Sequence, residues 1–132
     1  MVTNSWLEQV KEEIVDPERP IIDPHHHLWS DKKGASDYQI EQLWSDMAEG
    51  HNVVGTVFVE CSTNYRNTGP KRLWPVGETE YVVTQANKSH GTSTATEAPI
   101  LGIVSHADLK LGDAVVEVLE AHREASAGLL RG

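Results

Sequence analysis

The chain has 132 residues, of which 20 are acidic and 11 basic, so its formal net charge is −9. This length supports one compact domain with a hydrophobic core, and the charge argues against nucleic acid or an anionic membrane as the partner. Cys61 is the only cysteine, which fits a reducing compartment. Because no apolar run approaches the ~20 residues that span a bilayer, we expect a cytoplasmic protein without membrane contact.

Residues 1–19 predict a helical extension that precedes the main domain. Ser5 and Glu8 fit a capping box, and the helix would end at Pro17. The apolar residues that follow the cap at helical spacing are Leu7, Val10 and Ile14. The main domain then covers residues 20–132.

Strand and helix patterns alternate along this main domain. Strands are predicted where short apolar or β-branched runs occur, at 20–27, 53–60, 100–105 and from 129 onward. Helices are predicted at 38–47, 78–89 and 113–128, the last beginning at an Asp113 cap. Loops are predicted at 30–37, 61–76 and 90–97. The strand starts recur at roughly the ~30 residues of one βα unit.

Repeated βα units build either an open doubly wound sheet or a closed (β/α)8 barrel, and both bind ligands at the carboxyl ends of the strands. No glycine-rich phosphate loop follows any strand, which weakens the nucleotide-binding version of the open sheet. The sequence therefore favours a partial (β/α)8 TIM barrel, of class α/β, with about four βα units and parallel strands.

Three histidines stand together in the segment 20–29, at the end of the first strand. Side chains in a strand alternate between faces, so Asp23, His25 and His27 would share one face and His26 would have a structural role on the other. Imidazole suits Zn²⁺ and neighbouring divalent metals. Two ligands are fewer than the three that a catalytic zinc normally has.

Several stretches resemble the amidohydrolase-related family of TIM-barrel metal-dependent hydrolases. They are Ile22-Asp-Pro-His-His-His-Leu-Trp29, Val53-Val-Gly-Thr-Val-Phe-Val-Glu60, Gly102-Ile-Val-Ser-His-Ala-Asp-Leu109 and the closing Leu-Arg-Gly. The similarity is closest to the branch with sugar lactonases and 2-pyrone-4,6-dicarboxylate lactonase. It runs from Pro20 to Gly132 and covers only the N-terminal half of the expected barrel.

The resemblance implies a hydrolase that cleaves a lactone or amide-type bond through a metal-activated water. His25 and His27 match the family's first-strand metal ligands, and the implied cofactor is a divalent metal such as Zn²⁺. The substrate would be a small lactone or carboxylate-bearing molecule. Because the family's other ligands lie on later strands, we expect the isolated chain to be inactive. The alternatives are an inactive fragment or binding module derived from such a hydrolase, and an open doubly wound domain that binds a small anion.

Other polar residues follow the strands. Glu60 and Asp108, at the ends of the second and third strands, are the candidate catalytic carboxylates, and His106, also just past the third strand, is a further candidate. Asp23 either orients a histidine ring by a hydrogen bond or is a turn residue before Pro24. The remaining residues have plain structural interpretations: surface or helix-face positions for His51, His90 and His122, and a small buried side chain for Cys61.

A sheet of about four strands leaves free edges and an uncovered face. We therefore expect one of three outcomes. The chain forms a homodimer through that face, it aggregates, or it is a fragment of a longer enzyme.

Overall fold

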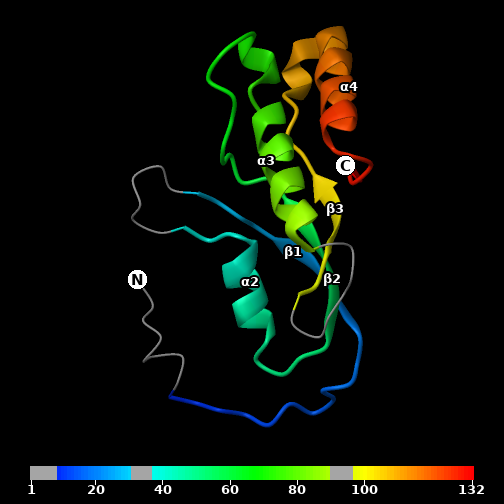
Figure 1. Ribbon diagram of the computed structural model, residues 1–132. Coiled ribbons are helices and arrows are strands. Elements are labelled where there is room, and N and C mark those ends of the chain that lie inside the picture. Colours follow the sequence, from blue (N-terminus) through cyan, green and yellow to red (C-terminus); the bar gives the residue numbers. More distant parts are fainter. Residues whose placement is uncertain (1–8, 31–36, 90–96) are drawn as a thin grey trace.

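The computed structural model describes residues 9–30, 37–89 and 97–132. They form an α/β fold with a three-stranded parallel sheet and three α-helices (Figure 1). The strands are β1 (Ile21–His26), β2 (Val53–Val59) and β3 (Ile100–Val104), and the helices are α2 (Ile40–Met47), α3 (Val76–Ala86) and α4 (Val115–Ala125). Three 3₁₀ turns accompany them: η1 (Lys71–Leu73), η2 (Asn87–Ser89) and η3 (Leu109–Ala114).

The strands lie in chain order, β1-β2-β3, and every pairing is parallel. The segment predicted as a fourth strand begins to pair with β3. Leu130 forms an isolated parallel bridge with Ile103, and the Ile103 amide donates to the Leu129 carbonyl at 2.8 Å. The predicted α/β class and parallel strands are therefore confirmed. Within the described residues the sheet is open, with three strands and one bridge in place of four full units.

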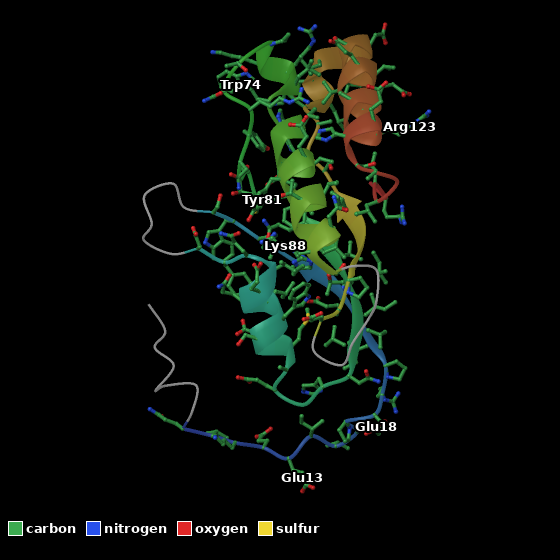
Figure 2. The ribbon with its side chains drawn as sticks, viewed as in Figure 1. Glu13, Glu18, Trp74, Tyr81, Lys88 and Arg123 are labelled. Atoms are coloured by element: carbon green, nitrogen blue, oxygen red, sulfur yellow. The ribbon has the colours of Figure 1, made fainter. Side chains whose placement is uncertain are left out.

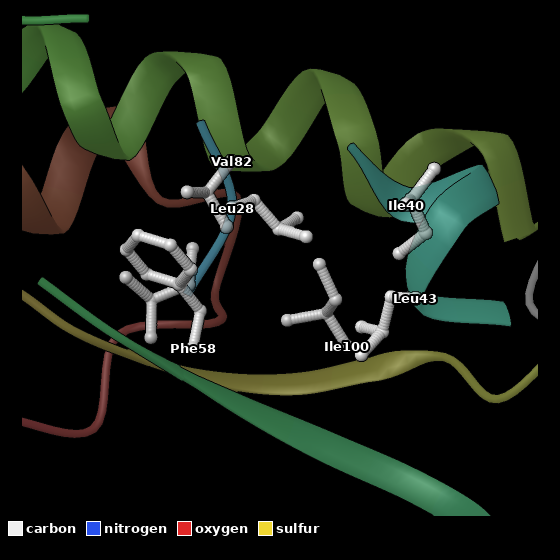
Figure 3. Close-up of a cluster of buried hydrophobic side chains, with 7 residues drawn as sticks. Leu28, Ile40, Leu43, Phe58, Val82 and Ile100 are labelled. Atoms are coloured by element: carbon white, nitrogen blue, oxygen red, sulfur yellow. The ribbon is translucent and has the colours of Figure 1, made fainter. Parts of the chain in front are cut away.

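The core lies between the sheet and the helices α2 and α3 (Figure 3). Its members are Leu28, Ile40, Leu43, Phe58, Val82, Ile100 and Ile103. Phe58 of β2 and Val82 of α3 are fully buried, and each such side chain stabilises the fold by about 1.5–3 kcal/mol. This packing holds α3 against the sheet, with the helix N-terminus beside the loop that follows β2.

The other face of the sheet carries exposed apolar side chains. Ile22 is 54% exposed and Leu101 is 41% exposed. Leu101 lies over Gly55, where an added Cβ would come within 2.2 Å of its Cδ1 atom. An exposed apolar face agrees with the expectation for an open sheet, whereas pairing with a second copy stays a prediction.

The predicted N-terminal helix is wrong for the described part of residues 1–19. Residues 9–19 form turns and irregular chain with no helix, and Figure 2 shows Glu13 and Glu18 on this segment, away from α3 and α4. In the described part of the predicted apolar stripe, Val10 is 70% exposed and only Ile14 is partly buried, beside Gly50, so the stripe lacks a continuous surface to pack on. Short helices are marginal in water without such packing. Residues 1–8 lie outside the described residues.

All three predicted helix starts differ from the structure, and α2 begins at Ile40, two residues after the predicted start. α3 begins at Val76, ahead of the predicted residue 78. Asp113 does not cap α4, because it lies inside η3, where Gly112 has a φ of 57° and interrupts the helical backbone. Asp108 caps η3, whereas the N-cap residue of α4 is Ala114, which makes no side-chain capping bond. Most of two predicted loops, residues 31–36 and 90–96, and with them His90, lies outside the described residues.

Candidate functional site

A bulge in β1 sets the direction of its side chains. Asp23 pairs in register with Thr56 and His26 with Phe58, so three steps along β1 match two steps along β2. His26 consequently turns into the core, where it is 6% exposed and its ring lies edge-on to Phe58 with the centroids 5.9 Å apart. The structural role predicted for His26 agrees with this burial.

The bulge also places Asp23 on a different face of β1 from His25 and His27. Asp23 lines an open pocket of about 380 Å³ together with Leu43 and Met47 of α2. The prediction that it shares the face of His25 and His27 is therefore wrong, because a bulge breaks the strict alternation of an ideal strand. Its carboxylate still contacts the site through the backbone, since Oδ1 accepts a hydrogen bond from the His25 amide at 3.1 Å.

The rings of His25 and His27 converge at the carboxyl end of β1. Their Nε2 atoms are 3.3 Å apart, and the rings are perpendicular with centroids 4.9 Å apart. His27 Nδ1 lies 2.8 Å from the Val59 carbonyl oxygen, which can only accept a hydrogen bond. Nδ1 must therefore carry the proton, and the neutral ring presents a lone pair on Nε2 toward His25.

This geometry fits a bound divalent metal. Two nitrogens that each lie ~2.05 Å from one tetrahedral Zn²⁺ are separated by ~3.3 Å, which matches the separation of the two Nε2 atoms. The bond from His27 Nδ1 to a carbonyl is the arrangement that usually orients a metal-ligating imidazole. In the part of the chain that the structure describes, no third histidine, cysteine or carboxylate completes the group. His25 and His27 therefore have the spacing of two metal ligands, and a hydrogen bond between the two rings has the same spacing.

Glu60 and His106 approach each other at the carboxyl ends of β2 and β3. Glu60 directly follows β2, and its amide donates to the Val104 carbonyl at 2.9 Å. Its Oε1 atom lies 4.0 Å from Nδ1 of His106, and both side chains are partly exposed. Since Val59, the residue before Glu60, holds His27, the ends of all three strands meet here. At 4.0 Å the two groups are beyond hydrogen-bond distance, so a proton would pass between them through a bridging water or after a small movement of either side chain.

Asp108 is occupied as a helix cap. Its Oδ1 atom accepts a hydrogen bond from the Lys110 amide at 3.0 Å, at the start of η3. We therefore predict that Asp108→Ala lowers the free energy of unfolding by about 1 kcal/mol, whereas Asp108→Asn, which keeps a capping oxygen, changes it by a few tenths at most. Urea unfolding of the three proteins measures this. Equal stability of Asp108→Ala and the wild type would remove the capping role and leave the catalytic prediction.

The plain interpretations of Cys61 and His51 agree with their positions. Burial raises the pKa of the Cys61 thiol to about 11, helped by the nearby Glu78 carboxylate, so the thiolate is scarce at neutral pH. The thiol lies 3.6 Å from the Leu28 carbonyl, to which it donates. His51 is exposed and borders the pocket beside α2.

Two buried polar residues near the site were missed or misplaced by the sequence analysis. His122, predicted at a surface or helix-face position, is 1% exposed on α4 and bonds to Thr79 and to the His106 carbonyl. Its spacing of four residues from the buried Val118 is the signal that places it on the inner stripe of α4. Glu78 is 2% exposed and bonds to the loop after β2. No sequence signal distinguishes it from a solvated carboxylate in the first turn of a helix.

Comparison of the chain with models of protein families, with curated proteins and with solved structures found no match. The described residues contain no helix that is long and apolar enough to cross a membrane.

Proposed function

We propose that this chain carries part of the metal site of a hydrolase related to the amidohydrolases, which acts on a lactone or amide-type bond of a small molecule. The observation that carries the proposal is the convergence of the two Nε2 atoms, 3.3 Å apart, at the carboxyl end of a parallel strand. Carboxyl ends of parallel strands are where α/β barrels place their catalytic groups.

The strand order supports a barrel-type arrangement over the doubly wound alternative. A doubly wound sheet reverses its order, so that a later strand pairs on the far side of β1. Here β3 pairs with β2, and the following segment pairs with β3 through the Ile103–Leu130 bridge. Continued pairing in chain order is typical of the first units of a (β/α)8 barrel.

The residues of the chain would have separate tasks in such a hydrolase. His25 and His27 would hold the divalent metal, and the Val59 carbonyl keeps the His27 ring in the protonation state that binding needs. A bound metal of this kind supplies Lewis acidity and lowers the pKa of water to about 7. Glu60 and His106 would move a proton between the attacking water and the leaving oxygen, a contribution of about 10²–10⁴ in rate.

Turnover needs groups that the described residues do not bring together. They supply two imidazoles and no third ligand, so the metal would be weakly held. We therefore propose that this chain binds metal without hydrolysing substrate by itself. A binding module that retains the metal pair is the second candidate, and it rests on the same incomplete ligand set.

Zinc titration of the tag-free chain tests the metal site. We predict that the double variant His25→Ala plus His27→Ala binds Zn²⁺ at least ~10-fold more weakly than the wild type, because it loses both converging lone pairs. Isothermal titration calorimetry at pH 7.5 measures the difference. His51→Ala, which removes an exposed histidine elsewhere, serves as the matched control and is expected to bind like the wild type. Equal Zn²⁺ affinity of the double variant and the wild type would overturn the proposal of a metal-dependent hydrolase.

A further inference from the structure

Glu78 holds the loop that carries Glu60. It lies in the first turn of α3 and is 2% exposed. Its Oε1 atom accepts hydrogen bonds from the amides of Cys61, at 3.0 Å, and Thr63, at 2.8 Å. Ser62, between these two donors, has a φ of 65°, the left-handed conformation that turns neighbouring amides toward one acceptor. The backbone that directly follows Glu60 is therefore fixed by a buried side chain from another element.

The approach of α3 to this loop depends on Gly77. A Cβ atom at Gly77 would lie 2.5 Å from the Arg66 amide nitrogen and 2.6 Å from the Asn64 carbonyl oxygen. Only a residue without a side chain allows the helix to come this close to backbone atoms. The close approach puts the next residue, Glu78, within hydrogen-bond distance of the loop.

His122 holds the loop that carries His106. Its Nε2 atom lies 2.9 Å from the His106 carbonyl oxygen, and its Nδ1 atom lies 2.8 Å from Thr79 Oγ1. The carbonyl can only accept, so Nε2 donates and the neutral ring accepts from the Thr79 hydroxyl at Nδ1. Thr79 Oγ1 in turn lies 2.8 Å from Ser105 Oγ, whose proton it accepts. Burial lowers the pKa of His122, which keeps the ring in the neutral form that this chain of bonds requires.

We propose that Glu78 and His122 are positioning residues that hold Glu60 and His106 beside each other. Each reaches from a helix to the loop after one strand, and the two held loops contribute the two members of the pair. The purpose of the pair rests on the proposed hydrolase function, whereas its positioning does not depend on metal or substrate.

The test measures how strongly His106 responds to Glu60, in metal-free protein with a chelator present. The readout is the change in the His106 ring resonances in NMR spectra when Glu60→Gln is introduced. In the wild-type background we expect Glu60→Gln to shift the His106 ring resonances by a resolved amount. This shift should be at least halved in the backgrounds Glu78→Met and His122→Asn, which remove the bonds to the two loops.

Conservative variants separate positioning from general destabilisation. Glu78→Gln keeps an oxygen for the two amides, and His122→Gln keeps an N–H that reaches the His106 carbonyl, so both should retain the full response. Glu80→Met, which removes an exposed carboxylate of α3 that pairs with Arg66, is the matched control and should also retain it. An undiminished response in Glu78→Met and His122→Asn would overturn the proposal.

A second measurement applies if those two variants fail to fold. In the wild type, the Cys61 and Thr63 amides should exchange with solvent at least ~10-fold more slowly than exposed loop amides, and this protection should persist in Glu78→Gln. Exchange as fast as in exposed loops would overturn the role of Glu78. A zinc titration in which the double variant and the wild type bind equally would overturn the hydrolase proposal. It would not affect the His106 resonance shift or the exchange of the Cys61 and Thr63 amides.

Discussion

The variant Gly77→Ala is expected to lose about 3 kcal/mol of its free energy of unfolding. The added Cβ would meet three backbone atoms, the nearest being the Arg66 amide nitrogen at 2.5 Å and the farthest the Tyr65 carbonyl carbon at 2.9 Å. Backbone atoms cannot rotate away, so either α3 or the loop at 64–66 must shift. Alanine is favoured over glycine inside a helix by about 1 kcal/mol, and the steric conflict has to exceed that gain.

Gly102→Ala provides the matched control for this prediction. Its added Cβ would also come close to a neighbour, at 2.9 Å, but that neighbour is Cγ of the Arg131 side chain, which can rotate toward solvent. We expect it to cost less than about 1 kcal/mol. Chemical denaturation of both variants measures the difference. If Gly77→Ala were as stable as the wild type, the helix would not lie against the loop backbone, and the contacts of Glu78 would lose their basis.

The strands were predictable because short runs of β-branched and apolar residues are typical of strands in a parallel sheet. The segment 53–59 is nearly continuous in β-branched and apolar residues, and β2 covers it as predicted. The convergence of His25 and His27 was also predictable, since residues two apart in a strand share a face, and their 3.3 Å contact confirms it. The position of Asp23 was not predictable, because the bulge depends on pairing with the neighbouring strand and no local sequence pattern indicates a bulge.

The rest of the candidate site depends on contacts between distant residues. Glu60 and His106 meet because two loops are held in particular conformations, and the loop after β2 has a positive φ at Asn64, a residue type that adopts it readily, and at Ser62, which seldom does. The burial of His122 was not predicted, because its bonding partner, Thr79, lies 43 residues away on another helix. Helix periodicity indicates that a position is buried, but it does not identify the group that satisfies a polar side chain there.

His26 makes the folded chain sensitive to acid. It is 6% exposed, and neither ring nitrogen has a hydrogen-bond partner in the described residues. Burial lowers its pKa from 6.5 to about 4, an effect that the charge of Asp23 opposes in part. Above pH 6.5 both the folded and the unfolded chain hold a neutral ring. Between pH 6.5 and about 4 only the unfolded chain takes up the proton, so acid favours unfolding.

We predict that His26→Leu removes this part of the acid sensitivity. In the wild type, His26 alone should cost about 3 kcal/mol of unfolding free energy on going from pH 7 to pH 4, and the variant should lack that loss. The variant should also be more stable at pH 7, by about 1–3 kcal/mol, because two unpaired ring nitrogens leave the core.

Urea unfolding at pH 7, 5.5 and 4 with a chelator present measures both effects of His26→Leu. The comparison with the wild type removes the contributions of all other titrating groups, and His51→Leu controls for the loss of an exposed histidine. Parallel pH profiles for His26→Leu and the wild type would mean that the His26 ring reaches solvent. The inward turn that the bulge gives to β1 would then be wrong, and with it the separation of His26 from the two converging rings.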